Sequence, residues 1–508
     1  MLIQSALIKN AGVQPEKSAL VFGENRYSYG DVDVLTDRVA RRLKTLGLKR
    51  GERVLIYLDN RPEVIFSVYG ILKADGIFVV INPDTKLEKL VYILNNCEAS
   101  MVISSAKFLN EESMQTVRKE CRSVRNFIDA DDGETYGYEC LLSNHDGEKN
   151  NVFAENISID IAGIIYTSGS TGTPKGVTMS HLNIMTAVNS ISTYLRNTSD
   201  DIIIDMLPLS FDYGLYQVFM CFTFGGTLVL LSNLAYFYTV IETIQREKVT
   251  GFPLVPTILS LLFKLKNPGA LDLSSVRYIS NTGAAIPVHY IKKFRELFPD
   301  IQIYSMYGLT ECKRVAYLEP EEIDTRPSSV GKAMPDLEAF IVDDEGNRLG
   351  PGNTGMLVVR GASVMQGYWN DPESTSEKIK PGRYPLERFL ITGDIFRMDD
   401  EGYLYFIGRK DDLLKIKGER VAPREVENIL LRFPDVVEAT VIGVPDEMFG
   451  TALKAYIVCS DSQNGVDVDE VKLFCSRYLE SYAVPRQIIM TDNLPRNANG
   501  KIEKSKII

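Results

Sequence analysis

The stretch Tyr166-Thr167-Ser168-Gly169-Ser170-Thr171-Gly172-Thr173-Pro174-Lys175-Gly176 decides how this chain is interpreted. An apolar run at 161–165 precedes it, and Val177-Thr178-Met179 follows it; both are typical of buried strands. Glycines let the backbone approach a ligand closely, hydroxyls donate hydrogen bonds, and Lys175 adds positive charge. We therefore predict a polyphosphate-binding loop that joins two strands.

Two better-known loops do not fit this string. A Walker A loop needs a second glycine where Pro174 stands. A nucleophile elbow around Ser170 needs a glycine where Ser168 stands. The structural alternative is a solvent-exposed loop rich in Ser, Thr and Gly.

Length and charge narrow the possible functions. With 508 residues, 45% of them hydrophobic and 24% charged, the chain has the composition of a globular protein with two or more domains. Its net charge of −11 argues against binding nucleic acid or an anionic membrane, because both need a basic surface. An anionic nucleotide would have to be held by a few local cations and backbone amides.

Cysteine usage and hydropathy predict a cytoplasmic protein. The seven cysteines form no CxxC pair and there are only three histidines, so a structural zinc site is not expected. An odd, scattered set of cysteines fits a reducing compartment. The first residues lack the layout of a signal peptide. The most apolar stretch, Val218 to Leu231, is too short to span a bilayer and is interpreted as buried core.

Periodicity predicts an α/β fold. Helices are expected at about 30–46, 62–73 and 85–95, and they alternate with strands at 54–57, 78–81 and 101–103, which predicts parallel sheets covered by helices. A second layer of this type is expected from 161 to 300. A β-rich subdomain at 330–406 and a small α+β unit follow. That unit should contain helices at 424–431 and 468–479 and strands at 437–442 and 453–458, whereas 144–156 should be a loop. We place the domains at 1–408 and 409–508.

The phosphate-loop string resembles that of the adenylate-forming superfamily, which includes acyl-CoA synthetases, peptide-synthetase adenylation domains and luciferases. Further elements follow in the family's order, from about residue 20 to the C-terminus. They are Tyr307-Gly308-Leu309-Thr310-Glu311, Thr392-Gly393-Asp394, the hinge-like Gly408-Arg409-Lys410-Asp411, Lys415-Ile416-Lys417-Gly418-Glu419-Arg420, and the lysine motif from Leu494 to Lys501. Each is common alone, but their joint order is specific.

The resemblance implies that a carboxylate attacks the α-phosphorus of ATP. Two anions about 4 Å apart repel by about 4 kcal/mol at an effective dielectric of about 20, so positive charge must offset the repulsion. By resemblance, Glu311 holds Mg²⁺, Thr310 and Lys501 contact the carboxylate or α-phosphate, and Lys175 acts with the phosphate loop. Nucleotide contacts are implied for Asp394 and Arg409 at the ribose and for Tyr307 at the adenine, beside Gly283-Ala284-Ala285.

The acid substrate is less clear from the sequence. Asp212 lies where amino-acid-activating members carry the partner of the substrate amine, and it is equally well explained as a structural residue. The other residues expected to line the acyl pocket are Tyr213, Tyr216, Thr282, Met306 and Arg314. Arg314 could face a second carboxylate or a neighbouring acid of the protein.

The acceptor is expected to be a thiol supplied in trans, as CoA or as a separate carrier protein. Residues 418–427 resemble the acyl-CoA synthetase version of the family. By resemblance, Asp411 is the pivot of a rotating C-terminal domain and Gly418 lines the thiol tunnel; a turn glycine is the simpler explanation of Gly418. The alternatives are a stand-alone enzyme that loads an amino acid or acyl group onto a carrier protein, and an inactive homologue that binds nucleotide or acyl ligands. A luciferase-like oxygenation has no support beyond the shared motifs.

Overall fold

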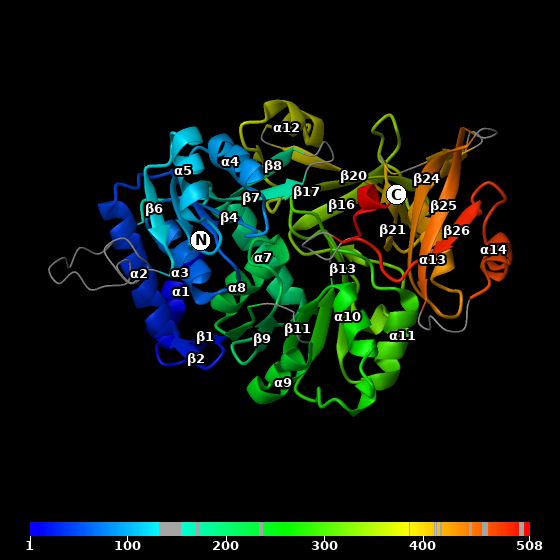
Figure 1. Ribbon diagram of the computed structural model, residues 1–508, viewed down its shortest axis with the longest axis horizontal. Helices are drawn as coiled ribbons and strands as arrows, with labels where there is room; N and C mark the ends of the chain where they lie inside the picture. The colour runs from blue at the N-terminus through cyan, green and yellow to red at the C-terminus, as the bar shows by residue number, and fades with distance from the viewer. Residues whose placement is uncertain are drawn as a thin grey trace.

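The protein has two stacked α/β layers, a β-rich region beside them and a small C-terminal α+β unit (Figure 1). The computed structural model describes residues 1–131, 154–168, 173–232, 237–281, 283–385, 387–410, 412, 414–416, 419–446, 450–459, 466–496 and 502–507. This architecture confirms the predicted α/β class with a small C-terminal domain. In the described part of the chain, no helix combines the length and hydropathy needed to cross a membrane.

The first sheet carries the two strands that flank the predicted phosphate loop. Its central strands are parallel, whereas β8 pairs antiparallel with β7 and with β18. In spatial order the strands are β18 (Gly367–Tyr368), β8 (Pro174–Ser180), β7 (Ile161–Ser168), β4 (Ile77–Ile81), β3 (Arg53–Tyr57), β5 (Ala99–Ser104) and β6 (Asn126–Asp129).

The second sheet is parallel through its centre and antiparallel at both edges. In spatial order its strands are β15 (Lys332–Ala333), β14 (Ala316–Tyr317), β13 (Gln302–Tyr307), β12 (Tyr278–Asn281), β11 (Gly251–Leu254), β9 (Ile202–Asp205), β10 (Thr227–Leu230), β1 (Ser18–Phe22) and β2 (Asn25–Ser28).

The prediction that 161–300 forms a layer of its own was wrong in detail. Residues 161–180 belong to the first sheet, and residues 18–28 belong to the second. An apolar run marks a strand but does not reveal which strand lies beside it, because the neighbours are chosen by long-range packing.

Helices fill the space between the two sheets and cover their outer faces (Figure 1). Helix α8 is buried on every side along most of its length, as expected for a helix that is apolar all round. It lies with α7 between the sheets, and both contribute to one large core. The helices of this part are α1 (Ile3–Val13), α2 (Tyr29–Thr45), α3 (Pro62–Lys73), α4 (Leu87–Asn96), α5 (Glu111–Glu120), α7 (His181–Tyr194), α8 (Asp212–Phe224), α9 (Phe237–Glu247), α10 (Pro256–Phe263) and α11 (Val288–Leu297).

The β-rich region was predicted correctly at 330–406. Its sheet contains β16 (Leu337–Val342), β17 (Thr354–Gly361), β20 (Arg388–Met398), β19 (Ile379–Pro381) and β21 (Leu404–Arg409), and the short helix α12 (Pro372–Lys378) lies against it. The 144–156 loop prediction falls mostly outside the described residues.

The C-terminal unit has its own hydrophobic core, separate from the main one. It contains β22 (Leu414–Ile416), β23 (Glu419–Val421), α13 (Pro423–Leu430), β24 (Val436–Asp446), β25 (Gly450–Cys459), α14 (Val468–Ser476) and β26 (Gln487–Met490). The predicted elements of this unit are confirmed. We propose a domain boundary at 408/409, because the main core ends before it and the second core begins after it.

A glycine in β7 tests how closely the first sheet is packed. Gly163 lies in register with Phe78 of β4, and a β-carbon at position 163 would collide with the Phe78 ring. Gly163→Ala should therefore lower stability by about 1–3 kcal/mol, the usual cost of overpacking a core. The urea-unfolding midpoint measures this change. Gly12→Ala in α1 is the control, because no atom lies within 4 Å of its added carbon; equal midpoints for the two variants would contradict the packing.

Candidate active site

The carboxyl ends of three parallel strands bring the predicted site residues to one edge of the second sheet. Strand β13 ends at Tyr307, β12 ends at Asn281 just before Gly283, and β9 ends at Asp205, a few residues before Asp212. Ligands of open parallel sheets bind at this edge, because loops from adjacent strands converge there.

Tyr307 and Arg409 both contact the buried carboxylate of Asp394, and all three were predicted to bind the nucleotide. Asp394 of β20 accepts a hydrogen bond from the Tyr307 hydroxyl, and its other oxygen lies 3.5 Å from Nε of Arg409, its partner in the β20–β21 register. Burial raises the pKa of Asp394, although the Tyr307 hydroxyl and the Arg409 guanidinium both act in the opposite direction. The carboxylate is thus held in one orientation, as an acceptor for ligand hydroxyls requires.

Glu311 lies close to this group and is held by a tyrosine. The Tyr368 hydroxyl donates to Oε1 of Glu311 at 2.7 Å, and the Met365 amide donates to the Glu311 backbone carbonyl at 2.7 Å. Tyr368 belongs to β18, which pairs with β8 beside the phosphate loop. Thr310 lies next to Glu311 in the same turn and is partly exposed.

The donor set around Glu311 fits Mg²⁺. No lysine or arginine of the described residues forms an ion pair with Glu311, and no group of three or more candidate metal ligands occurs in the described parts. Mg²⁺ is usually held by one or two carboxylates together with phosphate and water oxygens, so a single available carboxylate suits it.

Two lysines near the site contact only neutral groups. Nζ of Lys175 donates to the Ser374 hydroxyl at 2.6 Å and lies 5.5 Å from the centre of the Tyr368 ring. Nζ of Lys378 donates to the Thr392 carbonyl at 3.2 Å. Neither lysine forms an ion pair with a carboxylate in the described part of the chain, which leaves both charges available to an anionic ligand.

The predicted strands on both sides of the phosphate loop are present, and they pair with each other. Thr167 of β7 lies opposite Lys175 of β8, and the segment 169–172 connects these two strands in the chain. Gly169, Ser170, Thr171 and Gly172 lie outside the described residues, and so does the side chain of Ser168. Their phosphate contacts stay predictions.

Asp212 in the predicted acyl pocket already has a cationic partner. Nζ of Lys313 lies 3.5 Å from the Asp212 carboxylate and donates to the Asp212 carbonyl at 2.6 Å; the two side chains are 7% and 1% exposed. Burial lowers the pKa of Lys313 well below its ordinary value, and the Asp212 charge opposes this. The pair supports the structural explanation of Asp212 over that of an amine receptor.

The remaining described pocket residues gather around this pair. The Tyr213 hydroxyl donates to the Ser280 carbonyl at 2.7 Å, and the Arg314 guanidinium lies 4.5 Å from the Tyr213 ring centre. Arg314 forms no ion pair with an acid of the described residues, so the predicted neighbouring acid is not found there. Tyr216 and Met306 are also buried. Thr282 lies outside the described residues.

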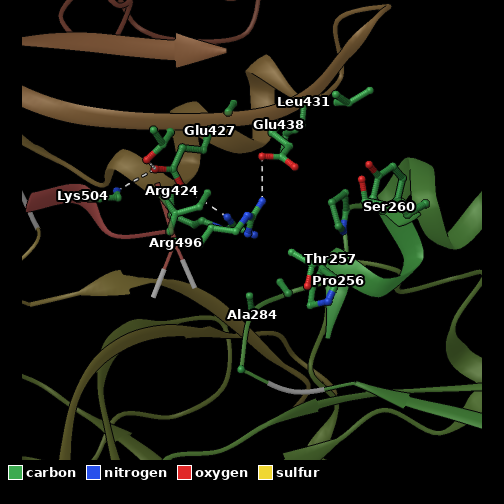
Figure 2. A pocket seen from close by; sticks show the side chains of 18 residues that line it. Pro256, Thr257, Ser260, Ala284, Arg424, Glu427, Leu431, Glu438, Arg496 and Lys504 are labelled. Atoms are coloured by element: carbon green, nitrogen blue, oxygen red, sulfur yellow. Dashed lines mark hydrogen bonds and ion pairs between the residues drawn. The ribbon is translucent and has the colours of Figure 1, made fainter. Parts of the chain in front are cut away.

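Gly283, Ala284 and Ala285 line a cavity of about 250 Å³ between the two domains (Figure 2). Gly283 has a φ of +84°, which favours glycine, and the Asn281 side chain donates to the Ala284 carbonyl at 2.8 Å. The opposite wall comes from α13, β24 and the C-terminal segment. The residues predicted beside the adenine therefore face the C-terminal domain. Lys501, Asp411 and Gly418 lie outside the described residues.

Sequence reasoning missed three residues of the site. Tyr368 and Lys378 come from a region without a recognised motif, and only the pairing of β18 with β8 and the packing of α12 bring them near Glu311 and Asp394. Lys313 lies two residues after Glu311 of the Thr310-Glu311 motif, and a lysine in such a buried stretch was the available signal.

Comparison with known proteins identifies the family. The family described as AMP-binding enzyme matches residues 7–369, and the AMP-binding enzyme C-terminal domain matches residues 425–501. A 4-coumarate–CoA ligase of Vanilla planifolia is 30% identical over 94% of this chain and 87% of its own. A plipastatin synthase of Bacillus subtilis is 28% identical over 99% of this chain, which spans 19% of that protein.

Solved structures agree with this assignment. The o-succinylbenzoate CoA synthetase of Bacillus subtilis in complex with its acyl-adenylate superimposes with a TM-score of 0.85 at 27% identity, covering 99% of this chain and 97% of the other. The same enzyme has been solved with ATP and magnesium ion. This chain belongs to the AMP-binding enzyme family and is an AMP-forming ligase that uses ATP and Mg²⁺ to join a carboxylic acid to a thiol.

Proposed function

We propose that the chain activates a carboxylic acid without an α-amino group and transfers the acyl group to CoA. The distribution of charge in the site carries this proposal. Lys175 and Lys378 have neutral partners and Glu311 has no cationic partner among the described residues, whereas Asp212 is already paired with Lys313. The site can therefore receive phosphates and a metal at one end, whereas Asp212, the carboxylate predicted to bind an amine at the acyl end, already has a cationic partner.

The reaction consists of two displacements. A carboxylate oxygen attacks the α-phosphorus of ATP and pyrophosphate leaves; then the thiolate attacks the acyl carbon and AMP leaves with that oxygen. Lys175 and Lys501 stabilise the negative charge of the first step, and Asp394 and Arg409 orient the ribose. Bound Mg²⁺ supplies further neutralisation of the phosphates, and Glu311 would hold it.

We propose an aryl or arylalkyl acid as the substrate. Tyr213, Tyr216 and Met306, which are predicted to line the acyl pocket, are buried and carry aromatic and thioether groups, which suit a flat apolar ligand. The similarity to a 4-coumarate–CoA ligase and to an o-succinylbenzoate CoA synthetase supports this class.

CoA is the proposed acceptor, because these relatives are CoA ligases and residues 418–427 resemble the acyl-CoA synthetase version of the family. The free cysteines of the described residues support a cytoplasmic location. A stand-alone enzyme that loads a carrier protein is the second candidate, supported by the similarity to a plipastatin synthase along 99% of this chain.

A pyrophosphate-release screen tests the proposal. Aryl, fatty and amino acids are each supplied with ATP and Mg²⁺, and thioester formation is then followed with CoA or with a phosphopantetheinylated carrier protein. Pyrophosphate release with aryl acids and thioester formation with CoA are expected. An enzyme that responds only to amino acids and acylates only the carrier protein would contradict the proposal.

Glu311 is predicted to bind Mg²⁺ through its carboxylate. Glu311→Gln keeps the shape of the side chain and removes its charge, so more Mg²⁺ should be needed for half-maximal pyrophosphate release. Tyr368→Phe removes the hydroxyl that orients Glu311 and should shift the Mg²⁺ requirement in the same direction, but less. The Mg²⁺ titration measures both effects. Unchanged titrations would make Glu311 a structural residue.

Lys501 is predicted to serve only the first of the two half-reactions. Lys501→Ala should slow pyrophosphate release by about 10²–10³-fold, the effect of losing one electrostatic stabiliser. Conversion of a supplied acyl-adenylate to thioester should be preserved, because the adenylation charges are absent from that step. Equal losses in both assays would show that Lys501 does not serve adenylation alone.

The stability of the protein is predicted to depend on the pairing of Asp212 with Lys313. Asp212→Asn leaves the Lys313 ammonium buried without its counter-charge and should lower stability by about 3–5 kcal/mol. The double variant Asp212→Leu with Lys313→Met replaces the pair by apolar groups and should recover most of this loss. Urea unfolding measures the effect, and a double variant no more stable than the single one would contradict it.

The same residue decides the substrate class. The parent enzyme should activate a des-amino acid at least as well as the matching amino acid, because Lys313 already neutralises Asp212. Pyrophosphate release for one such pair of acids measures this preference. Strict rejection of the des-amino acid would favour the amino-acid-loading alternative.

A further inference from the structure

The described residues on either side of Lys501 in the chain pair with each other through their backbones. Arg496 and Ile502 form an antiparallel bridge, and the Glu503 amide donates to the Pro495 carbonyl at 2.8 Å. Lys501 immediately precedes Ile502 in the chain. The bridge therefore sets where Ile502, the chain neighbour of Lys501, lies relative to Arg496.

An ion pair anchors one side of the bridge to the neighbouring strand. Arg496 lies 2.8 Å from the carboxylate of Glu438 on β24 (Figure 2). The two side chains are 28% and 21% exposed, and both line the cavity that faces Ala284. Tyr290 of α11 lines the same cavity and interacts electrostatically with both Glu438 and Arg496. This pair thus lies where the C-terminal domain faces the larger one.

A second ion pair anchors the other side. Nζ of Lys504 lies 2.8 Å from Glu427 of α13 (Figure 2). It also donates to the Val441 carbonyl at 3.0 Å. Glu427 is only 5% exposed and accepts the Val441 amide at 3.0 Å, and Arg424 lies 3.4 Å away. A carboxylate buried to this degree must be paired, so its place in the fold is strongly determined.

Apolar contacts hold the same segment against the sheet but do not orient it. Leu494 is buried with Tyr456 and Val458, and Ile502 packs partly against them. The hydrophobic effect is not directional, whereas a charged pair at hydrogen-bond distance restricts the position of both backbones. The two ion pairs lie on opposite sides of the bridge and together define its orientation.

We propose that Glu438 and Glu427 are positioning residues for adenylation: they hold Arg496 and Lys504, and through them the Arg496–Ile502 bridge, which Lys501 adjoins in the chain. The proposal rests on the proposed role of Lys501 in the first half-reaction. On this proposal, the rate of adenylation also depends on Glu438 and Glu427. These two acids contact neither the substrate nor the nucleotide.

Glu438→Gln and Glu427→Gln in the full chain test the proposal. Each should slow pyrophosphate release by about 10- to 100-fold, because small misplacements of a catalytic group have effects of this size. Conversion of a supplied acyl-adenylate to thioester should stay within about twofold of the parent, since Lys501 serves only the first step. A loss confined to one half-reaction is not produced by general instability.

Two controls separate positioning from folding. Asp446→Asn breaks another ion pair of the same domain, the one with Arg486 at 2.7 Å, and should leave both half-reactions unchanged. The reversed pair, Glu438→Arg with Arg496→Glu, should regain at least half of the adenylation rate lost in Glu438→Gln. Glu438 is partly exposed, so Glu438→Gln should fold. It therefore tests the positioning role even if Glu427→Gln does not fold.

Lys501→Ala in the same assays distinguishes the two proposals. If Lys501→Ala loses adenylation while both glutamine variants keep it, positioning is refuted and the role of Lys501 stands. If Lys501→Ala adenylates normally, both ideas fail. Equal loss in Asp446→Asn, or equal loss in both half-reactions of the glutamine variants, would also overturn the positioning role.

Discussion

Electrostatic repulsion between two anions is the constraint on which the site depends. A carboxylate and the α-phosphate must meet in a protein whose own net charge is −11. The protein meets this constraint locally: among the described residues, Lys175 donates to a hydroxyl and Lys378 to a carbonyl, and neither forms an ion pair with an acid. Glu311 accepts from a phenol and forms no ion pair with a cation of the same described residues. Charges that are not committed to close ion pairs act more strongly on a ligand in a site of low dielectric.

The two-layer architecture explains how these groups come together. Parallel strands place Tyr307, Gly283 and the start of α8 at one edge of the second sheet. The first sheet contains β7 and β8, the two strands that the predicted phosphate loop joins in the chain. The β-rich region then adds Asp394, and β18 of the first sheet adds Tyr368. The buried Asp212–Lys313 pair lies among the residues where the acyl group is predicted to bind.

The fold class, most element positions and the order of the motifs could be predicted from the sequence, because each depends on contiguous residues. Tyr368 and Lys313 could not be assigned in this way, since their roles arise from contacts between distant segments. The assignment of 161–180 to the first sheet depends on packing such as that of Gly163 against Phe78. Asp212 shows the same limit: its motif allowed an amine partner, and only the fold revealed Lys313.

The fate of one oxygen atom tests the acyl-adenylate route most directly. The acid substrate is labelled with ¹⁸O in both carboxylate positions and incubated with the enzyme, ATP, Mg²⁺ and the thiol. Mass spectrometry then locates the label among the nucleotide and phosphate products. Attack of the carboxylate on the α-phosphorus predicts one ¹⁸O in AMP and none in pyrophosphate. Label in phosphate or pyrophosphate, or AMP without label, would contradict the account.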